Sequence, residues 1–152
     1  MFKADSIYMA EAIKEAVKAF DADEVPVGAV IVHDGRIIAR AHNQIKLLRD
    51  PTAHAEMIAI TQAASHLGSE RLLETTLFST VEPCAMCAGA MVLGRIKRLV
   101  YGAEDPKTGA AGSIMNVVNN RKLNHRISVA KGVLGRESAA LLKDFFALKR
   151  RK

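Results

Sequence analysis

Two short stretches of the chain carry side chains that could bind a metal ion and move protons. One residue separates His54 from Glu56, and two residues separate Cys84 from Cys87. Zinc in proteins takes imidazole and thiolate ligands, and three protein ligands leave a fourth position open for water, as in catalytic sites. The residue types therefore predict one zinc ion per chain, held by His54, Cys84 and Cys87. Glu56 is predicted to serve beside it as a general acid and base.

The spacing within each stretch indicates that both lie where a helix begins. A histidine and a glutamate two positions apart would diverge by roughly 200° in mid-helix, so they can share a site only in a first turn. The segment 50–52, Asp-Pro-Thr, predicts a helix start just there. Cys84 and Cys87 share a helix face because they are three residues apart, and Pro83 suits a first helical position. Two helix N-termini would then face the metal, and their positive ends favour thiolate over thiol.

Each motif alone has ordinary alternatives. A C-x-x-C pair also occurs as a redox pair, as half of a structural zinc site, or as two buried thiols. The motif H-x-E followed by P-C-x-x-C is, by contrast, the known signature of zinc nucleobase deaminases. The combination of the two motifs in this order therefore indicates deaminase chemistry.

Length, composition and charge narrow the class of protein. The 152 residues, 49% hydrophobic and 25% charged, predict a single globular domain over residues 1–152. We expect no membrane span and no signal peptide. Both cysteines lie in one C-x-x-C, which predicts a reducing cytoplasm instead of a disulfide framework. A net charge of +6 favours a polyanionic partner such as RNA. Part of that charge is in residues 149–152, which could equally be a solvated end.

Hydrophobic periodicity predicts the elements that position these residues. Helices are expected over residues 5–20, 54–67, 85–94 and 137–149. Strands are expected over residues 27–32, 36–41, 76–81, 97–102 and 127–129. Asp34-Gly35 predicts the turn of a hairpin between the first two strands. Helices alternate with the later strands, which implies crossovers between parallel neighbours, so we expect a mixed sheet with helices on its faces.

The chain resembles the bacterial tRNA-specific adenosine deaminases, within the cytidine/deoxycytidylate deaminase superfamily. The resemblance runs from the first helix to residues 144–146, and it rests on the stretches Val25–Val30, His54-Ala55-Glu56, Pro83–Met91, Asp105–Ser113 and Asn124-His125-Arg126. Beyond the zinc motifs, the stretch 105–113 is the most discriminating, because related guanine, cytosine and cytidine deaminases differ there.

This resemblance implies a cytidine-deaminase-like α/β fold, namely a three-layer αβα sandwich with a mixed five-stranded sheet, and a homodimer. It implies zinc-dependent hydrolytic deamination of adenosine to inosine at the wobble position of a tRNA anticodon stem-loop, mainly in an arginine tRNA. Contacts to the substrate are implied for Asn43, the Ala55 backbone, Asp105 and Phe146. In particular, Asp105 would contact a ribose near the target and Phe146 would line the nucleotide pocket. Position alone would instead make Asn43 a turn former.

Two other functions share parts of this pattern. One is a deaminase of free nucleobases, such as a guanine deaminase, which the net charge and the stretch 105–113 argue against. The other is a zinc-stabilised RNA-binding subunit without turnover. Glu56 argues against that alternative, because a purely structural zinc site does not need it. Residues 119–122, Asn-Asn-Arg-Lys, are less typical of the family.

Overall fold

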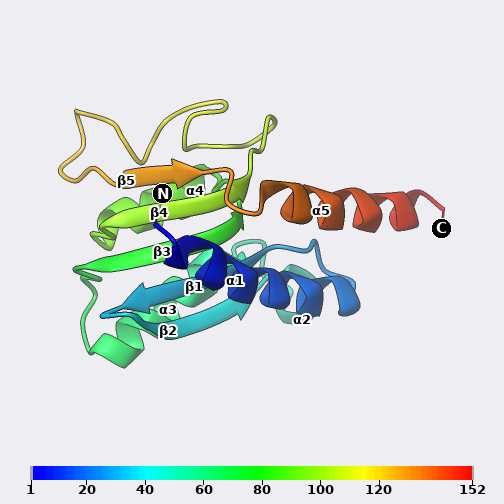
Figure 1. The fold of residues 1–152 in the computed structure, drawn as a ribbon, viewed down its shortest axis with the longest axis horizontal. Helices are drawn as coiled ribbons and strands as arrows, with labels where there is room; N and C mark the ends of the chain where they lie inside the picture. Colours follow the sequence, from blue (N-terminus) through cyan, green and yellow to red (C-terminus); the bar gives the residue numbers. More distant parts are fainter. Residues whose placement is uncertain (1, 152) are drawn as a thin grey trace.

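The computed structural model describes residues 2–151 as alternating helices and strands (Figure 1). The helices are α1 (Ala4–Asp21), α2 (Ile45–Leu48), α3 (Ala55–Leu67), α4 (Ala85–Leu93) and α5 (Gly135–Arg150). The strands are β1 (Gly28–His33), β2 (Arg36–His42), β3 (Thr75–Val81), β4 (Arg98–Ala103) and β5 (Ser128–Lys131). Within this part of the chain, no helix is both long and apolar enough to cross a membrane.

The strands form one mixed sheet in the order β2-β1-β3-β4-β5. β1 is antiparallel to both β2 and β3, whereas β3, β4 and β5 are parallel. The register pairs Val81 with Ala103 and Gly28 with His42. As a result, the carboxyl ends of β2, β3 and β4 and the start of β1 all lie at one end of the sheet. The segments that follow or precede these strands must meet there.

Helices cover both faces of the sheet, as the expected three-layer sandwich requires (Figure 1). Side chains alternate between the faces along each strand. Ile31 packs in the core beneath α3 and α4, and the neighbouring Val30 packs in the core beneath α1. In α1, Met9 and Ala12 are fully buried against the second face. The predicted fold class is therefore confirmed.

Backbone geometry explains two local features of β1. Asp34 and Gly35 both have positive φ angles, 50° and 72°, as a two-residue turn between twisted antiparallel strands requires. At Gly28, a side chain would overlap the backbone of α1 at Ala12. The missing side chain lets α1 lie directly on β1.

The expected strand 36–41 and the expected helix 54–67 leave residues 42–51 as a predicted loop, but the structure has the short helix α2 there. Its first amides are capped from a distant part of the chain, because the Glu24 carboxylate accepts the N–H groups of Lys46 (3.1 Å) and Leu47 (2.9 Å). A contact across more than twenty residues leaves no local periodic signal. The expectation of a loop was therefore wrong for these four residues.

Pro83 is not the first residue of α4, contrary to our prediction. Cys84 is the N-cap, with an extended backbone (φ −75°, ψ 176°), and its carbonyl accepts the first helical hydrogen bond, from Ala88 (2.9 Å). The Pro83 carbonyl instead accepts the N–H of Ala110 (2.8 Å). Pro83 is thus bound to the loop after β4, and the helix begins two residues later, at Ala85.

Candidate active site

The predicted metal ligands lie where two helices begin. His54 is the N-cap of α3, with an extended backbone (φ −71°, ψ 150°), and Glu56 lies in the first turn that follows. Cys84 is the N-cap of α4, and Cys87 is in its first turn. The extended caps turn the imidazole and the first thiol off the helix ends. The predicted arrangement of two helix N-termini around one site is therefore what the structure contains.

The three donor side chains are close enough to share one ion. The Nδ1 atom of His54 lies 3.7 Å from the sulfur of Cys84 and 3.5 Å from that of Cys87. All three donor atoms lie within 4.8 Å of one another. Tetrahedral zinc, with Zn–S near 2.3 Å and Zn–N near 2.0–2.1 Å, holds its sulfur and nitrogen ligands about 3.6 Å apart. The donor types and their spacing thus fit zinc.

The charges within this cluster also suit a cation. Hydrogen bonds with Cys87 and His54 lower the pKa of the Cys84 thiol to about 3, which makes it a thiolate. The hydrogen bond to Cys84 and burial raise the pKa of Cys87, so that thiol keeps its proton. The hydrogen bond with Cys84 also raises the pKa of His54. One thiolate already carries negative charge, and a divalent cation would take the place of the remaining thiol proton.

Glu56 stands beside the three clustered donors. Its side chain is only 4% exposed, and burial raises the pKa of its carboxyl group to about 7. A buried carboxyl group whose pKa lies near neutrality can both accept and return a proton. The environment of Glu56 is therefore that of an acid–base group.

These residues open onto a cavity of about 230 Å³, which we call the inner cavity. The predicted site residues that line it are Asn43, His54, Glu56, Cys84 and Asp105. Its apolar walls come from Val25, Val27, Ile45 and Val81. A small apolar cavity with a few convergent polar groups is the usual form of a small-molecule or base-binding site. The segments that line it are those that the sheet topology brings to one end.

Asn43 and Ala55 contact each other. The Oδ1 atom of Asn43 accepts the N–H of Ala55 at 2.8 Å, and Asn43 is 5% exposed. Asn43 thus supports the first turn of α3 and lines the inner cavity as well. The Ala55 N–H is thus used within the protein, and the contact that we predicted between the Ala55 backbone and the base stays a prediction. Asn43 also carries a side-chain amide nitrogen, which is a hydrogen-bond donor.

Asp105 lines the inner cavity and organises its own loop. One of its carboxylate oxygens accepts the N–H groups of Lys107 (3.0 Å) and Thr108 (3.1 Å), and the other accepts the Thr108 hydroxyl (2.8 Å). Burial alone would raise the pKa of Asp105, but the hydrogen bonds from Thr108 and Lys107 outweigh it and lower that pKa. Asp105 is therefore a carboxylate, and each of its oxygens can accept more than one hydrogen bond.

Phe146 does not line the inner cavity. It lines an adjoining cavity of about 390 Å³, the outer cavity, which shares Asp105 and Thr108 with the inner one. The ring of Phe146 is 44% exposed, whereas its neighbour Phe145 is 5% exposed. The structure therefore places Phe146 in the same cavity as Asp105, the predicted ribose contact. Glu56 lies in the adjoining inner cavity.

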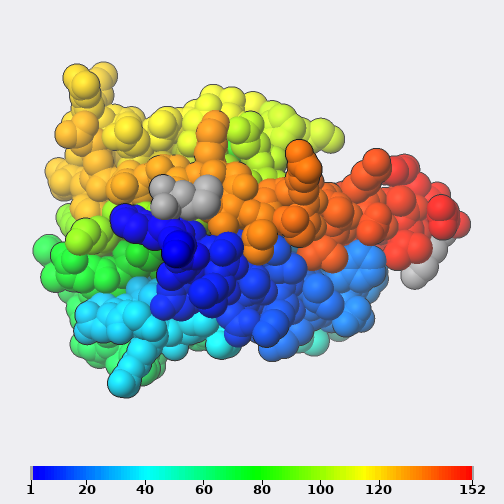
Figure 2. All heavy atoms as spheres, in the orientation of Figure 1, coloured from blue at the N-terminus to red at the C-terminus, as the bar shows by residue number. Residues whose placement is uncertain are grey.

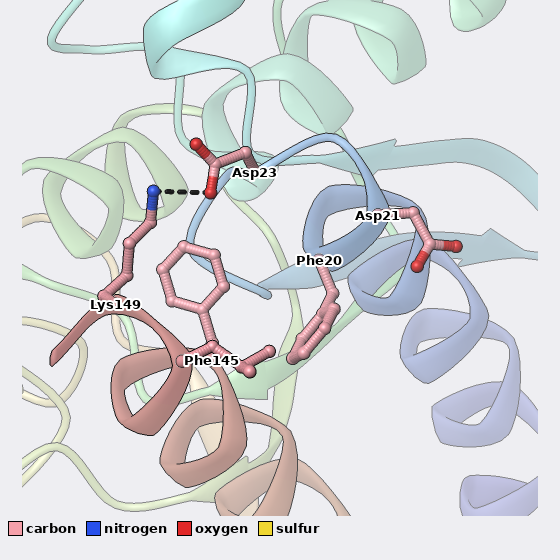
Figure 3. A pocket seen from close by; sticks show the side chains of 6 residues that line it. Phe20, Asp21, Asp23, Phe145 and Lys149 are labelled. Carbon is pink, nitrogen blue, oxygen red and sulfur yellow. Dashed lines mark ion pairs between the residues drawn. The ribbon is translucent and has the colours of Figure 1, made fainter. Parts of the chain in front are cut away.

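Figure 3 shows two neighbours of Phe146 on α5, Phe145 and Lys149, and their contacts. Phe145 packs edge-to-face on Phe20 of α1, with ring centroids 5.8 Å apart. One turn later, the Lys149 ammonium group lies 2.5 Å from the Asp23 carboxylate. These two contacts fix α5 against the end of α1, and they leave Phe146 on the side that faces the outer cavity.

Two further observations concern residues outside the predicted site. Glu82 lines the inner cavity and accepts hydrogen bonds from the loop after β4, a role that we did not predict from the sequence. The available signal was a carboxylate placed directly between an apolar strand and a metal motif. Residues 119–122 lie before β5, toward the end of the sheet opposite the site (Figure 1). They are therefore distant from the inner cavity.

Comparison with known proteins shows which family the chain belongs to. A family profile described as MafB19-like deaminase matches residues 3–150. The tRNA-specific adenosine deaminase of Bacillus subtilis is 49% identical over 148 residues, which is 97% of this chain and 92% of that protein. This chain belongs to the tRNA-specific adenosine deaminase family. The family that the motifs suggested, and the class of enzyme, are thereby confirmed.

Solved structures agree with this family assignment. A structure from biochemical and structural studies of A-to-I editing by tRNA:A34 deaminases is 46% identical, with a TM-score of 0.87. That match covers 90% of this chain and 99% of the other. A guanine deaminase from Nitrosomonas europaea has a TM-score of 0.82 at 24% identity, which shows a shared fold alone. The tRNA:A34 deaminase structure and the guanine deaminase share this fold with the chain, but the first is much more similar to it in sequence.

Proposed function

We propose that this member of the tRNA-specific adenosine deaminase family converts adenosine to inosine at the wobble position of a tRNA anticodon, with an arginine tRNA as the main substrate. One zinc ion would be held by His54, Cys84 and Cys87. The observation that carries this proposal is the three-donor cluster with zinc-like spacing beside the buried Glu56. Zinc in such a site supplies a polarised water, whose pKa falls from about 16 towards ~7.

Glu56 would move the protons of the reaction. Its carboxylate accepts a proton from the attacking water, and the water oxygen forms a bond to C6 of adenine. Glu56 then gives this proton to N1 of the ring, takes a second proton from the new hydroxyl group at C6, and delivers it to the departing amino group. The C6–N6 bond breaks, ammonia leaves and inosine remains. The position of Glu56 in the wall of the inner cavity supports this role.

The base and the ribose would be recognised by different parts of the cavities. The inner cavity is small, so the target base must leave its stack and enter alone, which costs less in a single-stranded anticodon loop than in a duplex. The amide nitrogen of Asn43 would donate a hydrogen bond to the base. The Asp105 carboxylate would accept one from a ribose 2′-hydroxyl, the group that distinguishes RNA from DNA.

A third cavity supports a path for the flanking nucleotides. This basic cavity, of about 420 Å³, is lined by Lys107, Phe146, Lys149 and Arg150. It shares Lys107 and Phe146 with the outer cavity, so the three cavities adjoin from Glu56 to the end of α5. Cationic groups beside an exposed aromatic ring suit phosphates and a stacked base. In Figure 2 the end of α5 projects from the body of the molecule, open to a large ligand.

We also propose that the enzyme acts as a homodimer, as the family resemblance implies. Large exposed apolar side chains, among them Leu93 (79%), Ile114 (54%) and Met115 (46%), offer surface that a second copy could bury. The proposed tRNA substrate also fits the cytoplasmic location that the cysteine usage predicts.

The function is tested by measuring ammonia release from tRNA, free guanine and free cytosine side by side. We expect release from tRNA alone, together with inosine in the recovered anticodon. Release from guanine or cytosine instead would identify a free-base deaminase. A zinc-loaded protein that binds tRNA without releasing ammonia would be a non-catalytic RNA-binding subunit.

A further inference from the structure

Glu82 has a position that the roles proposed above do not explain. It directly follows β3 and precedes Pro83 and Cys84, so it joins the central strand to a predicted metal ligand. Its side chain is only 3% exposed, although it ends in a carboxylate and lines the inner cavity. Burying a carboxylate is costly unless hydrogen bonds or a partner charge compensate. Its partners therefore indicate what it does.

The partners of Glu82 all come from the loop after β4. Its Oε1 atom accepts the N–H of Asp105 at 3.1 Å and also the hydroxyl of Ser113. Its Oε2 atom accepts the N–H groups of Ala111 (2.9 Å) and Ser113 (3.0 Å). Four donors thus converge on two carboxylate oxygens. They span residues 105–113, the segment that carries Asp105 at one end, and we call this segment the substrate loop.

Two more contacts show how closely the substrate loop is fitted to this carboxylate. At Gly109, a side chain would overlap the Glu82 carboxylate, so only glycine lets the loop pass there. The Ala110 N–H donates to the Pro83 carbonyl at 2.8 Å, next to Cys84. The loop is therefore attached both to Glu82 and to the residue that precedes the metal ligand.

We propose that Glu82 is a positioning residue that fixes the substrate loop, and with it Asp105, relative to the helix start that carries Cys84. The inference rests on the proposed role of Asp105 in binding the substrate ribose. A carboxylate is needed because it offers acceptors only. An amide would turn an N–H₂ group toward the loop donors and leave some of them without a partner.

The first test is structural and needs no substrate. Hydrogen exchange is measured on the zinc-loaded parent, on Glu82→Gln and on the control Glu74→Gln, which alters an exposed glutamate just before the other end of β3. We expect the amides of Asp105, Ala111 and Ser113 to exchange at least about tenfold faster in Glu82→Gln, with zinc content and the helix amides of α3 and α4 unchanged. Unchanged protection of these three amides, or lost zinc, would overturn the proposal.

The second test is a double-mutant cycle on an anticodon stem-loop made of RNA or of DNA. Glu82→Gln should raise KM for the RNA loop and lower its kcat/KM about tenfold to a hundredfold, and so reduce the preference for RNA over DNA. In an Asp105→Asn background the same change should cost much less, since both act on one contact. The positioning role would be refuted if the fold-losses in kcat/KM of the two single variants simply multiplied in the double variant. It would also be refuted if Glu82→Gln lowered kcat alone and left the preference for RNA unchanged.

Two variants keep the tests decisive if Glu82→Gln folds poorly. Ser113→Ala removes one donor without touching the carboxylate, and Gly109→Ala places a methyl group against it. Each should reproduce the faster exchange of the loop and the weaker preference for RNA, to a smaller extent in Ser113→Ala. Normal exchange and normal preference in both would overturn the proposal. A parent enzyme inactive on the RNA loop would refute the proposed function, while the exchange result would still decide the role of Glu82.

Discussion

Several side chains at the site have two roles, one in folding and one in chemistry. His54 and Cys84 are both N-caps, and they are also two of the three proposed zinc ligands. Asn43 binds the first amide of α3 and also lines the inner cavity. Because the same residues start the helices and would hold the ion, we expect metal binding and the local fold to stabilise each other.

This coupling leads to a prediction for Cys84. Cys84→Ala removes the thiolate that would anchor the ion, so we expect zinc content to fall from one per chain to near zero and deamination to be lost. The control is Met86→Leu, which changes a half-buried residue between the cysteines to one of similar volume. Metal analysis of both purified proteins is the measurement. Full zinc occupancy in Cys84→Ala would contradict the assigned ligands.

Glu56 should affect turnover and little else. Glu56→Ala leaves the three donors in place but removes the proton carrier, so we expect kcat to fall by about 10²–10⁴-fold. Zinc content and the Kd for the RNA stem-loop should stay within about threefold of the parent, because general acid–base catalysis acts on the transition state. Single-turnover inosine formation and zinc analysis test this. Near-normal turnover, or lost zinc, would assign Glu56 a different role.

At the scale of elements, local patterns predicted most of what lies around the site. α1, α3, α4 and α5 and all the strands were expected, and His54 was correctly placed at a helix start. These signals are local, since each depends on the periodicity or capping of one stretch. What the sequence did not predict depends on contacts between distant stretches. Glu24 caps α2, and Glu82 binds the loop after β4.

The end of β3 illustrates this limit well. Both the start of α4 and the role of Glu82 depend on how residues 105–113 return to β3. Helix propensity predicts Pro83 in the first turn of α4. The Pro83 carbonyl instead accepts a hydrogen bond from Ala110, and Pro83 lies outside the helix. The parallel pairing of β3 with β4, which the alternation of helices and strands predicted, brings these segments together. The hydrogen bonds that then form between them have no signature in either segment alone.

The contact between α1 and β4 supplies a prediction about pH. Asp5 of α1 is 2% exposed and binds Arg98 of β4 through two hydrogen bonds of 2.8 and 2.6 Å. The hydrogen bond from Arg98 is the main reason that the pKa of Asp5 lies below its usual 3.8. A depressed pKa means that this stabilisation is complete well above pH 3.8 and is lost as the pH falls through the lower, folded-state pKa.

We therefore expect Asp5→Asn to lower the free energy of unfolding by about 1–2 kcal/mol at pH 7, since charged hydrogen bonds are lost. The difference from the parent should shrink toward zero as the pH falls below about 3.8. Denaturant unfolding of both proteins at several pH values measures this difference in free energy. Acid affects the metal ligands of both proteins alike, so that effect cancels when the two free energies are subtracted. Asp34→Asn, an exposed turn residue, is the control and should change stability by less than about 0.5 kcal/mol. A difference that is constant with pH would contradict the argument.

For the molecule as a whole, the sheet topology brings the site residues to one end of the sheet, and α5 lines the cavities that adjoin them. Segments before β1 and after β2, β3 and β4 meet at one end of the sheet, where they form the inner cavity. From there the outer and basic cavities continue to the end of α5. The net charge of +6 fits a polyanionic substrate. Which cationic side chains could contact that substrate depends on where they lie on the surface. Lys149 and Arg150 both line the basic cavity, but Lys149 is already paired with Asp23.

The last prediction follows from this distribution. Binding of the anticodon stem-loop should weaken as salt rises, because each contacted phosphate releases condensed counterions. Arg150→Gln and Lys107→Gln should each reduce the slope of log Kd against log salt by about 0.7–0.9, since each removes one phosphate contact. Lys14→Gln, an exposed residue of α1 paired with Glu11, removes the same charge away from the cavities and should leave the slope unchanged.

Deleting residues 149–152, of which the structure describes 149–151, should flatten the slope by at least as much as Arg150→Gln. This deletion also removes the ion pair with Asp23, so loss of the α5 anchor could weaken binding at every salt concentration without changing the slope. The slope, and not the affinity at one salt concentration, therefore separates phosphate contact from the support of α5. Equal slopes for the parent, the deletion and Arg150→Gln would show that this end of α5 is merely solvated.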